Sequence, residues 1–269
     1  MKAIQLRIYS HEVRSGTQSV ERAILLLKLV AFASGNGVTL SDLVQQSALN
    51  RTTLHRLLKC LMQQGTIRFD SARKSYFLGP LMFQISVVST QRVDLHALLS
   101  TALTRIAEDT GDTAFLSVRS DNHAIYIDRR AGSYPIKTFV VEVGTRRPLG
   151  IGAGSLTMLS ALPEDEIRKV LKSNESNLAA YGMTEKKLMA AVAKTRKIGY
   201  ASMPVEGLNG VVALGLPVLD ALGAPIAAFS VAAIADRMSL SRQLEILQIL
   251  RREADWLENS LRSNNVLDR

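Results

Sequence analysis

The sequence predicts an α+β protein with two domains, a winged helix-turn-helix followed by an antiparallel sheet that carries helices. Between residues 39 and 65 lie two short amphipathic helical segments with a tight turn between them, and two short β runs follow directly. In the rest of the chain, two groups of strand-like segments flank a block of helical segments. The length of 269 residues exceeds one usual domain, and the hydrophobic content of 47% supports more than one core.

The helix-turn-helix is defined by caps and by apolar spacing. Its first helix begins at Thr39, where Asp42 completes a capping box, and it places Leu40, Leu43 and Val44 on one face. After the turn Ser47-Ala48-Leu49, Asn50 caps the second helix, and Gly65 ends it. The apolar stripe of the second helix consists of Leu54, Leu57, Leu58 and Leu61.

The opposite face of this second helix carries cationic and hydroxyl-bearing side chains. That pattern is typical of a recognition helix, whose first turns reach base edges and phosphates in the major groove of DNA. The alternative is an ordinary helical hairpin with a solvated polar face. The helix side chains that we expect to contact DNA are Arg51, Thr52, Thr53, His55, Arg56 and Lys59.

The segments on either side complete a winged-helix domain. A helix from Ser19 to Ala33 precedes the motif, and we expect its buried face to contain Val20, Ala23, Ile24, Leu27 and Val30. The β runs at residues 66–69 and 75–78 surround a polar, basic turn and read as the wing. The wing side chains expected to contact the DNA backbone are Arg68, Arg73 and Lys74.

Positive charge is concentrated in the N-terminal part of the chain. Residues 1–92 contain 12 Lys and Arg against 4 Asp and Glu, a net charge of +8, whereas residues 93–269 contain 21 against 20, a net charge of +1. Neutralisation of DNA phosphates requires a localised positive field of this kind. A membrane surface would also attract it, but these cations flank a folded motif and do not line a long amphipathic helix. The charge distribution therefore favours DNA as the partner.

Neither a secretion signal nor a membrane span is expected. The first residues have no continuous apolar region before their charges and no small-residue cleavage site. The apolar stretch at residues 211–235 is broken by Gly, Pro and Asp into strand-sized pieces. The single cysteine, Cys60, cannot form an intrachain disulfide, and we expect it to be a buried filler of the second helix. These features predict a protein of the reducing cytoplasm.

The C-terminal part alternates strand and helix patterns, which predicts an antiparallel sheet with helices packed on it. We expect a linker helix at residues 81–88, with Leu81, Ile85 and Val88 on one face that contributes to a dimer contact, and a domain boundary around Gln91 and Arg92. Strands are expected at residues 114–119, 123–130, 136–143, 211–219 and 225–233. Helices are expected at residues 95–110, 155–162, 164–172, 185–198 and 240–261.

Several segments resemble, in order and spacing, those of one known family. They are SVERAILLL, LNRTTLHRLLKCLMQQG, YFLGP, EDTGDTAFLSV, GTRRPLGIGAGSLTMLSALPEDE, KIGY and VVALGLPVLDALGAPIAAFSVAA. From Ser19 to Leu261 the chain resembles the IclR (isocitrate lyase regulator) family of bacterial transcription factors. The resemblance implies dimers or tetramers on a palindromic operator. It also implies an N-terminal extension (1–16), a winged helix-turn-helix (17–79), a linker helix (80–93) and a GAF-like effector-binding domain (94–263).

The resemblance further implies where a small effector binds. The corresponding positions here are Gly152, Ala153, Gly154, Ser155, Met203, Ala213 and Ser230. Met203 and Ala213 stand where some members with small carboxylate ligands have Asp and Cys, and Ala232 replaces one of two paired serines. This less polar pocket favours an aromatic or larger apolar acid over glyoxylate. Phe115 or Leu116 adds an apolar wall, because strand alternation points only one of them inward.

Other chemistry has little support in the sequence. The run from Gly150 to Ser155 reads GxGxG, without the further glycine of a dinucleotide fingerprint or the Gly-Lys of a P-loop. Its glycines either offer N–H groups to an anion or let a helix pack closely. Ser155 lies in no GxSxG elbow, and only His96 or His123 could assist it as a nucleophile. The four histidines are scattered, so we expect no metal, no cofactor and no catalytic residue.

Two functions from different classes remain. The first is a ligand-responsive transcription regulator. The second is a small-molecule-binding or catalytic domain whose basic N-terminal part makes protein contacts or non-specific nucleic-acid contacts. The charge asymmetry, the wing and the order of the segments favour the regulator.

Overall fold

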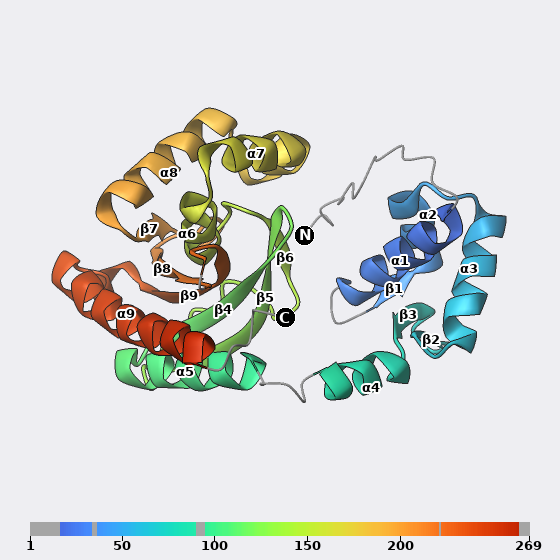
Figure 1. Ribbon diagram of the computed structural model, residues 1–269, viewed down its shortest axis with the longest axis horizontal. Helices are drawn as coiled ribbons and strands as arrows, with labels where there is room; N and C mark the ends of the chain where they lie inside the picture. The colour runs from blue at the N-terminus through green and yellow to red at the C-terminus, as the bar shows by residue number, and fades with distance from the viewer. Residues whose placement is uncertain (1–16, 34–36, 90–94, 221, 264–269) are drawn as a thin grey trace. The chain divides into compact units, whose positions relative to one another are not determined.

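The computed structural model describes residues 17–33, 37–89, 95–220 and 222–263 (Figure 1). The chain divides into two compact units, residues 1–92 and 93–269. The expected N-terminal extension, residues 1–16, and the expected boundary at Gln91 and Arg92 lie outside the described residues.

The N-terminal unit consists of helices around a small core, with a three-stranded antiparallel sheet of order β1-β3-β2. The core side chains Leu26, Leu43, Leu54, Leu58 and Ile67 are all at most 2% exposed. The elements are α1 (Gln18–Ala31), β1 (Val38–Thr39), α2 (Leu40–Ser47), α3 (Arg51–Gln63), β2 (Ile67–Asp70), β3 (Ser75–Leu78) and α4 (Pro80–Ser89).

The predicted caps of the helix-turn-helix are present. Thr39 Oγ1 accepts a hydrogen bond from the backbone N–H of Asp42, and Asp42 Oδ2 accepts one from the backbone N–H of Thr39, both at 3.2 Å. Asn50 Oδ1 accepts a hydrogen bond from the backbone N–H of Thr53 at 2.8 Å. Between the two helices, Ala48 adopts the left-handed conformation with φ of 54°. These contacts fix where α2 and α3 begin.

Two predictions about this unit are wrong. Val20 and Ile24 of α1 are 57% and 48% exposed, whereas Leu26 is fully buried. The second half of α1 is apolar almost all round, so the helical period alone does not select its buried face. Cys60 is exposed and not buried. It adjoins the buried Leu61 in sequence, but successive residues of a helix point about 100° apart.

The C-terminal unit is a six-stranded antiparallel sheet of order β6-β5-β4-β9-β8-β7, which confirms the α+β class. The strands are β4 (Thr113–Ser120), β5 (His123–Ala131), β6 (Arg146–Pro148), β7 (Ala201–Pro204), β8 (Val211–Leu219) and β9 (Pro225–Ile234). The helices are α5 (Leu95–Thr110), α6 (Ala153–Ala161), α7 (Glu164–Leu178), α8 (Glu185–Ile198) and α9 (Leu240–Ser263), and the 3₁₀ turns are η2 (Ala179–Tyr181) and η3 (Ala235–Arg237).

Helices cover both faces of this sheet. α5 and α9 pack on one face, and α6 packs on the other, with α7 and α8 beyond it (Figure 1). Strand alternation in β4 sends Leu116 to the α5 and α9 side and Phe115 to the α6 side. Every residue of α6 from Ala153 to Ser160 is buried. α6 is therefore an internal helix whose N-terminus lies inside the unit.

The strand expected at residues 136–143 is not formed. β5 instead pairs with the next segment: Tyr126 O accepts a hydrogen bond from Gly144 N at 2.7 Å, and the pairing continues through β6. Residues 136–143 are held by side-chain bonds, among them one at 2.5 Å from Thr138 Oγ1 to Ala232 O. Strands β1, β6 and β7 were not predicted, since they contain two, three and four residues and show almost no alternation.

The start of α6 lies in backbone contact with the sheet. A Cβ atom at Gly215 of β8 would stand 2.6 Å from backbone atoms of both Ala153 and Gly154. Gly154 itself faces the hydroxyl groups of Ser117 and Ser230 at distances of 3.2 and 3.4 Å from a Cβ position. Glycine at position 215 thus sets the distance between α6 and the sheet.

Gly215→Ala is expected to lower the free energy of unfolding by about 1–3 kcal/mol, because the added methyl group meets backbone that cannot rotate away. The matched control is Gly154→Ala. There the added methyl group meets only side-chain atoms, and alanine is more favourable than glycine within a helix by about 1 kcal/mol. It should change stability by no more than about 1 kcal/mol. Urea denaturation of both variants measures this. Equal stability of the two variants would contradict the packing argument.

Candidate functional site

The outer face of α3 presents a group of cations. Its inner side is fixed by the buried side chains Leu54, Leu58 and Leu61. Among the predicted DNA-contacting residues of this helix, Arg51, Thr52, His55, Arg56 and Lys59 are exposed and Thr53 is half-buried. Among the described residues, no acidic side chain forms an ion pair with the three cations of this face. The face is therefore free to bind an external anion.

The wing presents a second group of exposed cations. The guanidinium carbon of Arg68 lies 4.8 Å from the ring centre of Phe77, and that of Arg73 lies 5.8 Å from it. Asp70 Oδ1 accepts two backbone N–H bonds of the turn at 3.0 Å each, and the bond from Arg73 lowers the pKa of Asp70. Lys74 adopts a φ of 50° in the same turn. These contacts order the turn that carries the three predicted wing cations.

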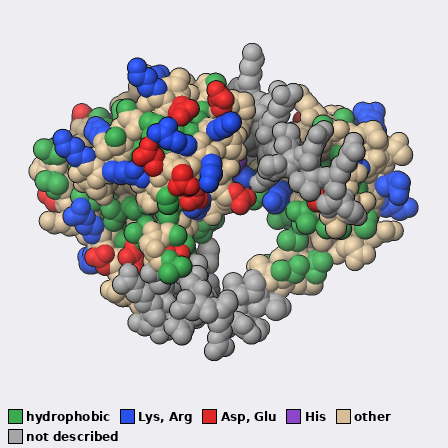
Figure 2. Space-filling model, turned by 45° about the horizontal axis from the view of Figure 1, so that its top comes forward, with side chains coloured by type: hydrophobic (Ala, Val, Ile, Leu, Met, Phe, Trp, Pro, Cys, Tyr) green, Lys and Arg blue, Asp and Glu red, His purple; other side chains and the backbone are tan. Residues whose placement is uncertain are grey.

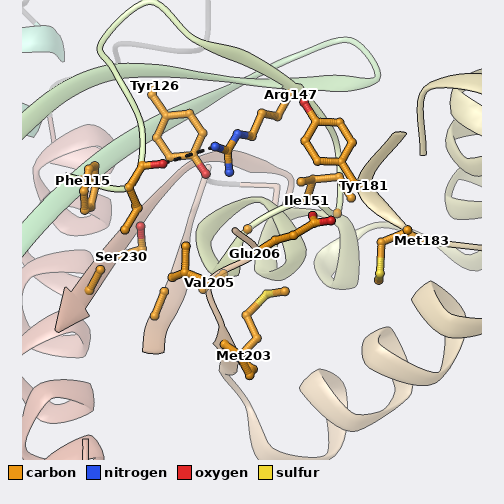
Figure 3. Close-up of a pocket in the computed structure, with 18 residues that line it drawn as sticks. Phe115, Tyr126, Arg147, Ile151, Tyr181, Met183, Met203, Val205, Glu206 and Ser230 are labelled. Atoms are coloured by element: carbon orange, nitrogen blue, oxygen red, sulfur yellow. Dashed lines mark hydrogen bonds between the residues drawn. The ribbon is translucent and has the colours of Figure 1, made fainter. Parts of the chain in front are cut away.

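A cavity of about 410 Å³ lies in the C-terminal unit, at the start of α6 (Figure 3). Five of the seven predicted effector-binding residues line it: Gly152, Ala153, Met203, Ala213 and Ser230. Phe115 is the member of the Phe115 and Leu116 pair that points into it. The positive end of the α6 macrodipole lies at the cavity wall, where it favours an anion.

The other two predicted residues, Gly154 and Ser155, do not line the cavity. Ser155 is fully buried behind the wall, where its Oγ accepts a hydrogen bond from Gly150 N at 2.9 Å and donates one to Pro148 O at 3.4 Å. Neither contact involves a histidine. Ser155 therefore holds the loop before α6 in place, and the nucleophile alternative has no geometric support.

The glycines of this loop are explained by close packing. Gly152 has a φ of 94°, and a Cβ atom there would lie 2.6 Å from Tyr126 Oη. Gly150 has a φ of 103°, and a Cβ atom there would lie 2.9 Å from a methyl group of Leu159. The close-packing alternative from the sequence is therefore the one that the geometry supports, although Gly152 also reaches the cavity.

Sequence reasoning missed four polar side chains of the cavity: Tyr126, Arg147, Tyr181 and Glu206. Arg147 Nη2 donates a hydrogen bond to Val140 O at 3.3 Å. Burial raises the pKa of Tyr126, while the nearby Arg147 lowers it. The signal for Arg147 was present in the run GTRRPLG, because two adjacent arginines in a strand point to opposite faces.

The neighbouring Arg146 points away from the cavity toward His123. Its Nη2 lies 3.1 Å from His123 Nδ1. Burial, with a further contribution from Arg146, lowers the pKa of His123 to about 4, so this ring is neutral near pH 7. Within the described ranges, no group of three His, Cys, Asp or Glu side chains is arranged to hold a metal ion. None of the helices in those ranges is long and apolar enough to cross a bilayer.

Two family models match the chain. The model described as bacterial transcriptional regulator IclR C-terminal matches residues 87–259, and the IclR helix-turn-helix domain matches residues 19–71. The chain belongs to the IclR family. It is a DNA-binding transcription regulator, as are its relatives in this family, and not an enzyme.

Individual relatives span almost the whole chain. The transcriptional repressor IclR of Escherichia coli is 29% identical over 236 residues, which are 85% of this chain and 84% of the repressor. The regulator KipR of Bacillus subtilis is 26% identical over 233 residues, 84% of this chain and 92% of KipR. These relatives cover both units and not one domain alone.

Solved IclR structures share the fold. One, an IclR regulator from a Silicibacter species, has a TM-score of 0.80 at 23% identity and covers 90% of this chain and 96% of its own. Another, an IclR homologue from Microbacterium hydrocarbonoxydans in complex with 4-hydroxybenzoate, has a TM-score of 0.71 at 19% identity and covers 91% and 99%.

For this IclR-family regulator, Arg56→Ala is expected to weaken binding to specific DNA about 5- to 150-fold, the loss of about 1–3 kcal/mol that one base-contacting arginine supplies. Folding should be unaffected, because Arg56 is exposed. Fluorescence anisotropy at fixed salt, on a duplex selected from random DNA by the unmodified chain, measures this. Gln63→Ala, at the exposed end of the same helix, is the control and should bind normally. Unchanged affinity of Arg56→Ala would show that α3 does not read the bases.

Proposed function

We propose that the protein binds a palindromic operator in the cytoplasm as an oligomer and changes its DNA affinity when it binds a small organic acid with an apolar, aromatic body. In this proposal residues 17–79 bind DNA, residues 80–93 link the units and residues 94–263 bind the effector. The observation that carries it is the 410 Å³ cavity at the N-terminus of the buried helix α6.

The cavity suits a ligand with an apolar body and a few polar groups. Phe115, Ile151, Met203 and Val205 contribute apolar surface to its walls (Figure 3). The buried hydroxyl group of Ser230 and the helix N-terminus supply hydrogen-bonding groups among these apolar side chains. The structural relative solved with 4-hydroxybenzoate supports an aromatic acid. These features favour such an acid over a small, highly charged one.

An oligomer is required by the size of the DNA-reading surface. One helix-turn-helix reads only a few base pairs, and site selection in a genome needs two or more copies on a symmetric site. Apolar side chains stand exposed on α4, where Phe83 is 72% and Ile85 is 50% exposed. Leu81, which we expected on the same face as Ile85, is half-buried, and the side chain of Val88 is not described. The exposed surface of α4 is a candidate for contact with a second copy.

Regulation then requires that the effector prefer one state of the oligomer. A ligand shifts an equilibrium only by the difference between its affinities for the two states. In our proposal, the filled cavity favours one arrangement of the DNA-reading units and the empty cavity favours another. The effector thereby changes operator affinity without touching DNA.

The chain is expected to form dimers or tetramers, with masses that are multiples of 29.4 kDa. Light scattering at micromolar concentration measures this, with and without DNA. The double variant Phe83→Asp with Ile85→Asp should shift the mass toward the monomer, because it charges an apolar contact surface. Leu222→Asp, at the 93% exposed turn between β8 and β9, is the matched control and should leave the mass unchanged. A monomer under every condition would contradict the oligomer.

Ala213→Leu and Ser230→Ala are expected to keep operator binding and to lose the response to the effector. The first fills the cavity, and the second removes a hydrogen bond worth about 0.5–3 kcal/mol, depending on the charge of the ligand group. Thermal shift against aromatic and aliphatic acids, followed by anisotropy on operator DNA, measures both effects. Ala131→Leu, at an exposed position of β5, is the control. A normal effector response in Ala213→Leu would place the binding site elsewhere.

A further inference from the structure

Arg147 borders an apolar cavity and has no acidic partner among the residues that the structure describes. Its side chain is half-buried, and its single hydrogen bond within the described ranges goes to Val140 O at 3.3 Å. A guanidinium has five N–H donors in a rigid fork, so most of this donor capacity is unused. Two other arginines of the unit, by contrast, have buried acidic partners: Arg237 Nε lies 2.9 Å from Asp112 Oδ1, and Arg105 Nη2 lies 2.6 Å from Glu253 Oε2.

The surroundings of Arg147 leave room for a carboxylate. Its guanidinium extends into the cavity beside Tyr126 (Figure 3), with its carbon 5.9 Å from the ring centre. Tyr181, from η2, approaches from the other side of the arginine (Figure 3). The charge of Arg147 acts on both phenols, since it lowers the pKa of each against the larger effect of burial. Two hydroxyl groups and one unpaired cation therefore border the same space.

One acidic group faces the cavity at its rim. Glu206 follows β7, and its Oε1 lies 3.9 Å from a Cβ position at Gly182 of the opposite segment. It forms no ion pair with Arg147, yet its charge also reaches Tyr181 and raises the pKa of that phenol. A ligand anion bound at Arg147 would experience repulsion from Glu206, weakened by solvent because Glu206 is exposed.

We propose that Arg147 binds the carboxylate of the effector and that Glu206 opposes further negative charge, which makes the cavity a site for monocarboxylates. This inference rests on the proposed function, since it names the ligand class of the same cavity. The carboxylate accepts two parallel N–H bonds from the guanidinium, the strongest geometry available to this pair. The apolar body then lies toward Phe115 and Met203, and Ser230 is left for a polar substituent of that body. The head group is thus held by a side chain and not by α6 alone.

The test compares matched acids and amides by isothermal titration calorimetry. The probes are benzoate, 4-hydroxybenzoate and hexanoate, each beside its neutral amide. The unmodified chain should bind at least one acid more tightly than its amide. Arg147→Met, which keeps the length of the side chain and removes its charge, should weaken binding of that acid about 10- to 100-fold, the loss expected for charged hydrogen bonds. Affinity for the amide should not change.

Two further variants separate charge from structure. Glu206→Gln should strengthen acid binding about two- to fivefold, as expected for loss of one exposed like charge, and should leave amide binding unchanged. Arg147→Lys should restore part of the acid affinity, because it restores the charge without the fork. Arg168→Met, which removes an exposed arginine of α7, is the matched control and should bind all probes normally. Unfolding midpoints confirm that each variant is folded.

Three results would overturn the assignment: no acid binds the unmodified chain, acids and amides bind equally, or folded Arg147→Met binds the acid normally. Failure of the proposed function has a different signature. In that case acid binding still depends on Arg147, but the bound acid leaves the affinity for selected DNA unchanged. If instead the acid changes DNA binding of Arg147→Met as it does for the unmodified chain, the proposed regulatory function is supported, but Arg147 is not the residue that binds the carboxylate.

Discussion

The close contact between α6 and the sheet determines the geometry of the C-terminal unit. At Gly215 the backbone of β8 approaches the backbone of Ala153 and Gly154 too closely for any side chain. At Gly152 the loop before the helix passes directly beside the hydroxyl of Tyr126. These two contacts place the positive end of a buried helix at the wall of the cavity. Cavity volume, wall composition and access to the helix terminus all depend on that position.

The two units use their charges in opposite ways. In the N-terminal unit, cations such as Arg56 point outward without acidic partners among the described residues, which suits a polyanion. In the C-terminal unit, buried acids such as Asp112 and Glu253 are paired with arginines, and Lys and Arg lie among Asp and Glu on the surface in Figure 2. Arg147, which borders the cavity, has no acidic partner among the described residues.

Local patterns in the sequence predicted much of the fold, and long-range packing determined what they missed. The helices at residues 185–198 and 95–110 follow directly from their periodicity, as does the face of α3. The segment at residues 136–143 has strand composition, but it forms no strand because β5 pairs with β6 instead. For the site, the family resemblance pointed to Ser230, which lines the cavity. Arg147 was missed because the three residues of β6 carry too little pattern to be predicted as a strand, so the two adjacent arginines of GTRRPLG could not be assigned to opposite faces. Ser155 lies behind the cavity wall, since the sequence does not show which side chains at a helix start face inward.

In our proposal the cavity and the DNA-binding surface are coupled in one molecule, and thermodynamic linkage tests this coupling directly. If the acid changes operator affinity by some factor, operator DNA must change the affinity for the acid by the same factor. The measurement is calorimetric titration of the acid into the protein with and without saturating operator, beside anisotropy titration of operator with and without saturating acid. Coupling of the two sites predicts equal factors, on the order of 5- to 150-fold. An acid whose affinity is the same for free and operator-bound protein would contradict it.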